Sequence, residues 1–256
     1  MKHFKTALFT LIFALGFLMI ACSDDNNTTN PPTDDPADYF KFAVGNWWLY
    51  ENDELDSNSQ KVPGSTYYDT TKIVSSMMYQ GKNTFLGISY YDDGTMDSSY
   101  FAVEGSKLFM YESELGNDDL LLPFGGWILM ADFNQTSWTI IDTSVVVDTV
   151  EVSEGVFGKL TATIKLSGTK GAKTNITVDG QTIESQEFTQ KLLLQGSLDL
   201  GIMQIPLNQE VLVKYYYGKN VGLVKVDQSP AAMTIPGFGN ITIPGELSVL
   251  LKYNIN

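Results

Sequence analysis

The chain has 256 residues and a formal net charge of −14, and 43% of its residues are hydrophobic. All 16 basic residues are lysines, so the chain lacks the basic patch and the paired guanidinium contacts that phosphates need, which excludes nucleic acid as a partner. The only histidine is His3 and the only cysteine is Cys22. Beyond Cys22 the sequence therefore excludes histidine-dependent triads, cysteine nucleophiles and the usual His/Cys metal centres. We predict a non-enzymatic protein with no metal and no cofactor.

Residues 1–21 have the composition of a secretory signal peptide. Lys2 and Lys5 give a positive start, an apolar stretch covers residues 7–20, and the small residue Ala21 precedes the cleavage position. The apolar stretch is shorter than the ~20 residues that a membrane-spanning helix needs. We therefore expect residues 1–21 to be removed during export.

Cys22 follows this leader directly. The sequence Met19-Ile20-Ala21-Cys22 resembles a bacterial lipobox, in which cleavage exposes a cysteine that carries several acyl chains, palmitate among them. Two or more acyl chains hold a protein stably on a membrane, at about 0.8 kcal/mol per buried methylene. We predict lipidation of Cys22. An uncleaved anchor and an ordinary secretory signal with an incidental cysteine are the alternatives.

Residues 22–38 are predicted to form the lipidated end and a tether. They are rich in Asp, Asn, Thr and Pro, a composition that buries too little apolar surface to offset its ordering entropy, so we expect a disordered acidic linker. Extended at ~3.1 Å per residue, it would span about 50 Å. The run Ser23-Asp24-Asp25 is similar to sorting signals of Gram-negative lipoproteins. We expect an outer-membrane location and leave the periplasmic face and the cell surface open.

From residue 39 to residue 256, apolar and polar residues alternate along short stretches that turn residues separate. This alternation, together with many β-branched and aromatic residues, predicts β-strands. Asp93-Gly94 and Asp179-Gly180 predict tight hairpins, because such turns need positive φ at both central residues. The segments 104–106 and 218–220 predict further turns. The predicted strands are 40–44, 47–50, 84–91, 100–103, 107–111, 138–141, 145–152 and 160–166.

These strands predict an all-β fold over residues 39–256. The architecture expected is a single domain of antiparallel curved sheet, in the form of a half-barrel, a barrel or a sandwich. The length agrees with one domain, since all-β domains of about 200–250 residues are common. One short helix at most is expected, over residues 113–122.

Three separated motifs resemble a family of bacterial secreted and lipid-anchored β-proteins, mostly of unknown function. The first is Val44-Gly45-Asn46-Trp47-Trp48-Leu49-Tyr50, similar to that family's G-N-x-W-x-Y strand. The second, at 150–157, is similar to its V-x-V-x-x-G-x-F element, and the third, at 217–225, to its G-V-G-L-V-K hairpin. The strand at 246–253 fits its end, whereas 229–245 departs from it as an insertion. The resemblance implies curved antiparallel sheets, akin to the half-barrel of outer-membrane lipoprotein carriers, and no catalytic residues.

The four tryptophans are the candidate ligand-binding residues of this sequence. Trp47 and Trp48 are consecutive, so on a strand they point to opposite faces, and one can lie in the core while the other is exposed. An exposed indole is a stacking surface for a sugar ring or a peptide. The alternative is that aromatic side chains fill the core, as they do in most β domains. The candidates are Trp47, Trp48, Trp127 and Trp138.

The acidic residues offer a less favoured route to chemistry. A glycosidase needs two carboxylates about 5–10 Å apart in a cleft, yet these residues lie in predicted turns, where solvated carboxylates are normal. The segment 92–97 also offers oxygen ligands for calcium, but a plain hairpin explains it better. The acidic candidates are Asp53, Glu54, Asp56, Asp92, Asp93, Asp97, Glu112, Glu114, Asp118 and Asp119.

A short repeat lies near the C-terminus. Thr-Ile-Pro-Gly occurs at 234–237 and again at 242–245, which predicts a loop or an irregular hairpin. Phe238 lies between the two copies and is a fifth candidate for ligand contact. Two roles stay open for segment 229–245. It either plugs one end of the sheet or exposes an apolar contact loop.

These observations favour a non-enzymatic, lipid-anchored β domain of the cell envelope. In the leading hypothesis it binds an apolar or amphiphilic ligand, or another envelope component, on the concave side of its sheet. The first alternative is a structural or adhesion module that acts through its surface and contacts an envelope protein. The second is a protein that binds or cleaves a glycan. Its expected partners are thus the membrane, through the lipid, and one of these ligands.

Overall fold

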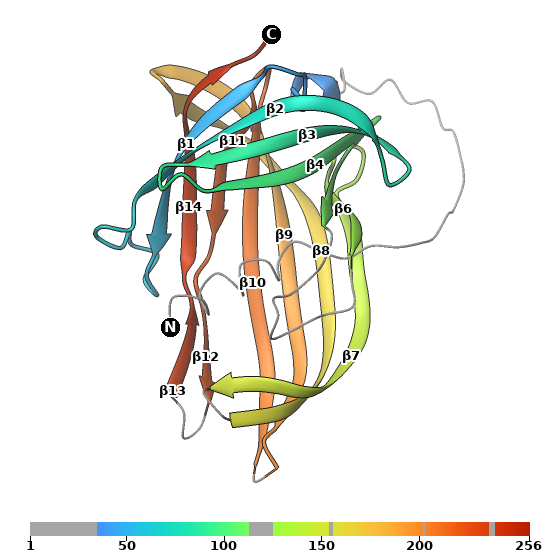
Figure 1. The fold of residues 1–256 in the computed structure, drawn as a ribbon, viewed down its shortest axis with the longest axis vertical. Helices are drawn as coiled ribbons and strands as arrows, with labels where there is room; N and C mark the ends of the chain where they lie inside the picture. The colour runs from blue at the N-terminus through green and yellow to red at the C-terminus, as the bar shows by residue number, and fades with distance from the viewer. Residues whose placement is uncertain (1–34, 113–124, 154–155, 202, 236–238) are drawn as a thin grey trace.

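The computed structural model describes residues 35–112, 125–153, 156–201, 203–235 and 239–256. Within this part of the chain, twelve antiparallel strands form one sheet that curves into a nearly closed barrel, and two more strands form a small separate sheet (Figure 1). The predicted all-β fold class is confirmed. No helix among the described residues is long and apolar enough to cross a bilayer.

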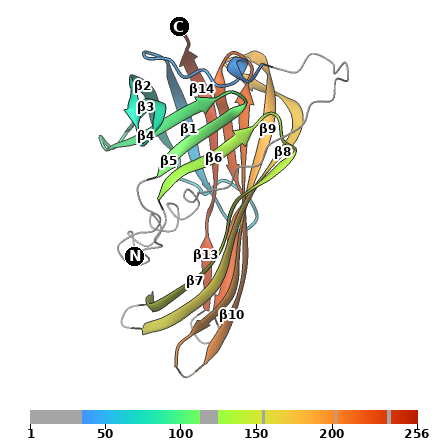
Figure 2. The ribbon, with the colours of Figure 1, turned by 90° about the vertical axis from the view of Figure 1, so that its right-hand side faces the viewer.

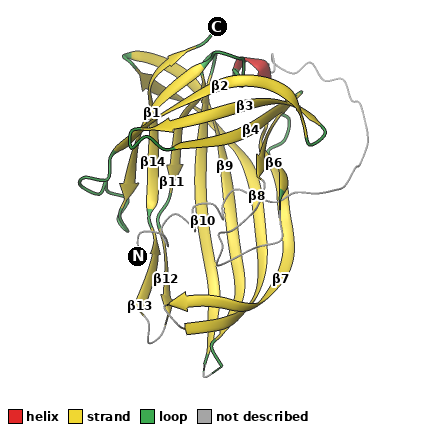
Figure 3. Ribbon diagram, viewed as in Figure 1, coloured by secondary structure: helices red, strands yellow, loops and turns green. Residues whose placement is uncertain are grey.

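Strand predominates over the described residues, and the one short helix lies at the end of the barrel where the C-terminus also lies (Figure 3). The elements are η2 (Pro36–Asp38), β1 (Trp47–Leu55), β2 (Tyr67–Tyr79), β3 (Lys82–Tyr91), β4 (Met96–Glu104), β5 (Lys107–Glu112), β6 (Gly126–Asp132), β7 (Ser137–Ser153), β8 (Val156–Val178), β9 (Gln181–Asp199), β10 (Gln204–Gly218), β11 (Gly222–Gln228), β12 (Ala231–Ile235), β13 (Gly239–Ile243) and β14 (Gly245–Asn254).

The sheet consists of two meanders that meet at its centre. Its strand order is β6-β5-β4-β3-β2-β1-β14-β11-β10-β9-β8-β7, so the first and last strands of the domain pair with each other. Their register runs from Trp47 opposite Asn254 to Leu55 opposite Gly245, with a bulge at Leu49/Tyr50. This pairing joins the two halves of the chain and therefore makes one continuous sheet.

Strands β7 to β10, with 15–23 residues each, are longer than every other strand. Seen from the side, β7 and β10 extend well beyond the short strands β1–β6 (Figure 2). The β12–β13 hairpin lies beside β10, where the Gln209 side chain donates to the backbone oxygen of Ala232 at 3.0 Å and Ser229 N donates to Leu212 O at 3.0 Å. The described ends of segment 229–245 thus contact β10, and Ala231 and Ile243 pack partly buried against the main core. The tip of this segment lies outside the described residues.

Side chains fill the concave side of the closed part of the barrel. Leu108, Ile128, Leu166 and Phe188 come from four different strands, and each is at most 1% exposed. Full burial of such a side chain stabilises the fold by about 1.5–3 kcal/mol. A packed core of this kind leaves little room there for an apolar ligand, which weakens the leading hypothesis for this part of the sheet.

The first and third sequence motifs contact each other in space. The Trp48 indole donates to the backbone oxygen of Val221 at 2.7 Å, and the Tyr50 hydroxyl donates to that of Leu223 at 2.8 Å. Gly222 has φ +100°, and a Cβ there would lie only 3.3 Å from the Trp48 ring nitrogen. These motif residues therefore hold β1 against the β10–β11 hairpin, which is a structural role.

The predicted strand at 40–44 is wrong, because the first strand begins only at Trp47. Gly45 has φ +97°, which breaks an extended run, and the buried Asn46 side chain donates to Lys41 O at 2.7 Å and accepts from Asn256 N at 2.9 Å. Phe40 is instead buried against the rings of Phe133 and Tyr217. The apolar side chain of Phe40 thus packs a loop, rather than a strand, against the core.

The two predicted hairpins differ in detail. Asp179 and Gly180 form a two-residue turn with φ +47° and +75°, as predicted. Asp93-Gly94 is part of a four-residue turn, because the Asp93 carboxylate accepts from the backbone and the hydroxyl of Thr95 at 2.8 and 2.6 Å. The helix considered for residues 113–122 lies outside the described residues.

Candidate functional site

Two of the four candidate tryptophans belong to the core. Trp48 is 4% exposed and Trp138 is 7% exposed. The Trp138 indole donates to Leu129 O at 3.3 Å, and its ring occupies the space over Gly168, where a Cβ would come within 2.1 Å of it. Both indoles are thus enclosed and hydrogen-bonded within the scaffold, so neither offers a ring face to a ligand.

Trp127 lies half-buried on the outer side of β6, among other aromatic rings. Its indole donates to Gln80 O at 3.0 Å and meets the Tyr111 ring edge-on at 5.3 Å. Tyr79 in turn stacks on Tyr100 at 4.0 Å and meets Tyr111 edge-on at 5.0 Å. These rings mainly contact one another. Phe238, the fifth candidate, lies outside the described residues.

Trp47 is the candidate that lines a groove. It starts β1 and points away from the buried Trp48, as the pleat of a strand requires. The groove has a volume of about 350 Å³ and lies between the start of β1, the end of β14 and the turn that joins β8 to β9. It is lined by Trp47, Val178, Asp179, Gln181, Lys252 and Tyr253.

The groove combines ring faces with hydrogen-bonding groups. Trp47 and Tyr253 are both half-buried, and both line the groove, although Tyr253 is the register partner of Trp48 and so lies on the other face of the β1–β14 pair. Asp179 supplies an acceptor, Lys252 a donor, and Gln181 both. Flat apolar faces beside a few polar groups are what a saccharide ring needs, since its C–H bonds stack on aromatic rings and its hydroxyls seek hydrogen bonds.

This groove lies at the end of the barrel where the described chain begins. Asp38, the last residue of η2, accepts from Asn220 N at 2.6 Å and lies 3.7 Å from the ammonium of Lys219. Lys219 N donates to Glu184 O at 2.8 Å, three residues after the groove residue Gln181. The β10–β11 turn thus links the start of the domain to the strand that forms one groove wall.

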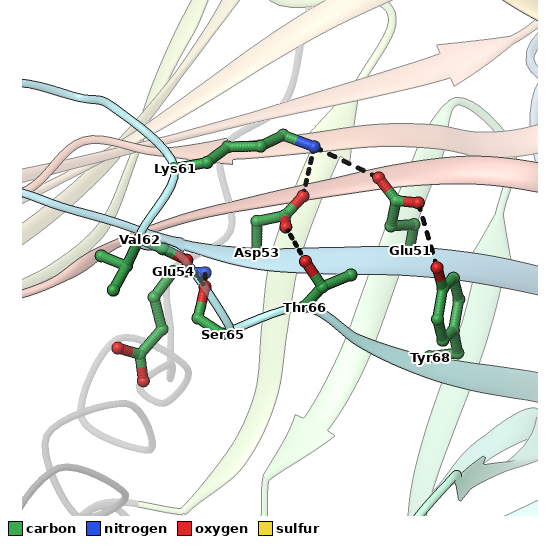
Figure 4. Close-up of polar contacts among 8 residues, drawn as sticks. All are labelled: Glu51, Asp53, Glu54, Lys61, Val62, Ser65, Thr66 and Tyr68. Carbon is green, nitrogen blue, oxygen red and sulfur yellow. Dashed lines mark hydrogen bonds and ion pairs between the residues drawn. The ribbon is translucent and has the colours of Figure 1, made fainter.

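On the outer side of β1, the acidic candidates brace the β1–β2 loop (Figure 4). The ammonium of Lys61 lies 3.2 Å from Glu51 and 2.5 Å from Asp53, and the Asp53 carboxylate also accepts from the Thr66 hydroxyl at 2.6 Å. Burial by itself would raise the pKa of Asp53, but the hydrogen bonds from Lys61 and Thr66 outweigh it and hold that pKa below its usual range. Glu54 joins the loop through its backbone, donating to the Ser65 hydroxyl at 3.0 Å.

The inner side of the same strands carries carboxyl groups and phenols. Tyr67 donates to the carboxyl of Glu246 at 3.1 Å, and Asn52 donates to Asp69 at 2.8 Å. Glu246 also lies opposite Glu54 in the register of β14 and β1, a pairing of like charges that favours a neutral carboxyl. We call Tyr67, Asp69, Tyr91, Asp97, Glu112, Tyr215 and Glu246 the inner acid–tyrosine cluster.

Two carboxyl groups of this cluster hold protons near neutral pH. Burial, with the charges of Asp69 and Glu54, raises the pKa of Glu246 to about 7 even though the Tyr67 hydrogen bond lowers it. Burial and the Asp97 carboxylate raise the pKa of Glu112 to about 8. Burial is the largest cause that raises the pKa of Tyr215, and Tyr217, Glu246 and Glu112 raise this pKa further. Neither acid lines the Trp47 groove.

The structure brings no cation site together from these acids. No group of three His, Cys, Asp or Glu side chains within the described ranges could hold a metal ion. In the turn at 92–95, which includes oxygen ligands that the sequence offers for calcium, the Asp93 carboxylate accepts hydrogen bonds from the backbone and the hydroxyl of Thr95. These bonds hold the pKa of Asp93 below its usual range.

The sequence predicts Asp97 and Glu112 as acidic candidates in turns, whereas both lie on strands, β4 and β5, and it does not predict that they join an inner acid–tyrosine cluster. In the sequence, Glu246 stands out only as the start of the strand at 246–253, and no local pattern distinguishes Tyr67 or Tyr91. The available signal was the period-two pattern itself, because polar residues at 67, 69 and 71 occupy the positions that face the barrel interior. The partners across strands, however, come from residues about 180 positions apart.

The fold of the described residues is a nearly closed antiparallel β-barrel, and the comparisons with known proteins assign it to no family. No protein-family model matches the chain, and no curated protein matches it. Among solved structures, a candidate lipoprotein from Parabacteroides distasonis aligns over 84% of this chain and 98% of its own, at 11% identity and a TM-score of 0.48. A candidate exported protein with a YmcC-like fold from Bacteroides fragilis aligns over the same shares, at 9% identity and a TM-score of 0.44. We draw no function from these likenesses.

Proposed function

We propose that this chain is a lipid-anchored envelope protein whose β domain binds a glycan in the Trp47 groove. The observation that carries the proposal is the groove itself, whose lining combines two half-buried aromatic residues with a carboxylate, an amide and an ammonium group. The anchor rests on Cys22 and its lipobox, and the outer membrane is the location that Ser23-Asp24-Asp25 favours. The resemblance to lipid-anchored bacterial proteins stays a prediction.

This proposal departs from an apolar ligand on the concave face. In the closed part of the barrel that face is filled by core side chains such as Phe188, which is fully buried. A cleaving enzyme would need an acid and an ionised partner in the same cleft, and Glu112 and Glu246 lie outside the groove. Binding without turnover is therefore the function that the groove supports best.

Binding is tested by intrinsic fluorescence and calorimetry with the full-length lipidated chain in detergent. The probes are maltotriose, chitotriose and trigalacturonate. At least one is expected to bind, and Trp47→Ala is expected to weaken it by about tenfold or more, since stacking on an aromatic ring is worth about 1–3 kcal/mol. Trp127→Ala is the matched control, because Trp127 is also half-buried on an outer face but lies in a different place.

Two results would overturn the proposal. One is that none of the three probes binds at millimolar concentration. The other is that a bound probe is unaffected by Trp47→Ala. The anchor is tested separately by mass spectrometry of the purified protein, which is expected to show an N-terminal acylated Cys22. An unprocessed N-terminus would contradict it.

A further inference from the structure

The lysines beside the groove differ from most lysines of the chain. Most lysines in the described ranges are paired with a carboxylate, such as Lys82 with Glu104 at 2.8 Å and Lys159 with Asp148 at 2.7 Å. Lys72 and Lys252 have no ion pair with any described residue, and both are exposed. An acidic chain with a net charge of −14 has carboxylates in excess, so two unpaired lysines in one place are notable.

The strand register puts these two lysines on either side of Trp47. Lys72 on β2 is the direct partner of Trp47, and directly opposed residues have Cβ atoms about 4.5–5.5 Å apart on the same face. On the other side, Lys252 of β14 is the partner of Leu49, two residues along the same outer face, and it lines the groove itself. Lys72 and Lys252 therefore lie at register positions next to Trp47 on the same outer face, one on each neighbouring strand.

The opposite wall carries the opposite charge. Asp179 occupies the tight turn between β8 and β9 and lines the groove together with Gln181. A ligand that lies against Trp47 thus meets cations on the sheet side and a carboxylate and an amide on the turn side. This polarity would orient a ring that carries an acidic group at one edge and hydroxyl groups at the other.

We propose that the groove selects an acidic saccharide, one whose ring bears a carboxylate or a phosphate that pairs with Lys72 and Lys252. This inference rests on the proposed glycan-binding function and names its ligand class. The ring stacks on Trp47, its anionic group faces the two lysines, and its hydroxyl groups donate to Asp179. A free acidic polysaccharide and the acidic sugar of a membrane glycolipid share this chemistry.

The test compares trigalacturonate with its fully methyl-esterified form, which keeps the rings and removes the charge. Full-length chain in detergent is titrated with each by calorimetry at low salt. The acid is expected to bind about tenfold more tightly than the ester, since two partly exposed ion pairs together contribute about 1.4 kcal/mol. Lys72→Ala/Lys252→Ala is expected to abolish this preference, so that acid and ester bind equally, whereas Lys107→Ala, which changes a lysine of β5 outside the groove, keeps it.

The outcomes separate this inference from the function on which it rests. If acid and ester bind equally and Trp47→Ala weakens both, the groove binds glycans but the acidic selectivity is wrong. If the acid binds and Trp47→Ala has no effect, the groove is not the site and both proposals fail, as they do if neither probe binds. With the selectivity established, acidic glycolipid vesicles tested against the free trisaccharide decide which source binds more tightly.

Discussion

The two faces of strand β1 carry similar residues at the start of the strand, and these are buried and hydrogen-bonded on the inner face and partly exposed on the outer face. On the inner face, Trp48 and Tyr50 are buried, and each donates a hydrogen bond to a backbone oxygen of the β10–β11 hairpin. On the outer face, Trp47 lines a groove beside lysines. Adjacent tryptophans in one strand are thus divided into a scaffold residue and a candidate binding residue by the pleat of the strand.

Acidic residues near β1 show the same contrast. On the inner face, burial raises the pKa of Glu246, which has a phenol rather than a cation as its hydrogen-bond partner. On the outer face, Lys61 and Thr66 hold the pKa of Asp53 down. The environment therefore favours the protonated form of Glu246 on the inner face and the ionised form of Asp53 on the outer face. We expect mutation and pH to change the stability of the two faces differently.

The largest effect is expected from the inner tryptophan. Trp48→Ala removes a buried ring and leaves the Val221 oxygen without its donor, and we expect a loss of about 3–5 kcal/mol in the free energy of unfolding. Urea denaturation followed by circular dichroism measures it. A loss below about 1 kcal/mol would mean that the inner face of β1 is not part of the core.

The second-largest effect is expected from the ion pair between Lys61 and Asp53 on the outer face. Lys61→Met leaves the buried Asp53 carboxylate with Thr66 as its remaining side-chain donor, and we expect a loss of about 2 kcal/mol. Lys165→Met is the control, because Lys165 and Asp142 are both about half exposed at 3.5 Å, and a pair of that kind contributes at most about 0.5 kcal/mol. Equal losses in the two variants would contradict a special role for Asp53.

The inner carboxyl should make stability depend on pH. The pKa of Glu246 is about 7 in the folded protein, above its ordinary value of 4.5, so its contribution is fully present below pH 4.5 and is lost as the pH rises through 7. Glu246→Gln keeps an acceptor for Tyr67 but cannot ionise. We expect the variant to be more stable than the wild type by about 1–2 kcal/mol at pH 8.5, after allowance for solvent screening, with a smaller difference at pH 5. Parallel stability curves from pH 5 to 8.5 would refute this assignment.

The smallest effect is expected from the outer tryptophan. Trp47→Ala should change the free energy of unfolding by about 0.5 kcal/mol or less, since the residue is only half-buried, while it is expected to weaken glycan binding. The same denaturation assay, run beside Trp48→Ala, checks it. A loss as large as that of Trp48→Ala would show that Trp47 also serves the core and would remove the contrast between the two faces.

The sequence predicted local structure well wherever a residue type constrains the backbone. Asp179-Gly180 forms the two-residue turn that its composition favours, because both residues adopt positive φ at low cost. The predicted strands at 138–141 and 145–152 are both parts of β7, and the one at 160–166 is part of β8. Residues 40–44 alternate as a strand does, yet the buried Asn46 and the positive φ of Gly45 make that segment a loop.

By itself, the sequence determined the all-β fold class and the opposite directions of Trp47 and Trp48, because both follow from the two-residue period of a strand. Only the tertiary structure decided which indole is buried and which groups meet it. Trp47 shares its groove with Asp179 and Lys252, which come from a turn and a strand far away along the chain. Glu246 likewise meets Tyr67 across 179 positions. Such partners depend on strand order and register, which long-range pairing and core packing select together.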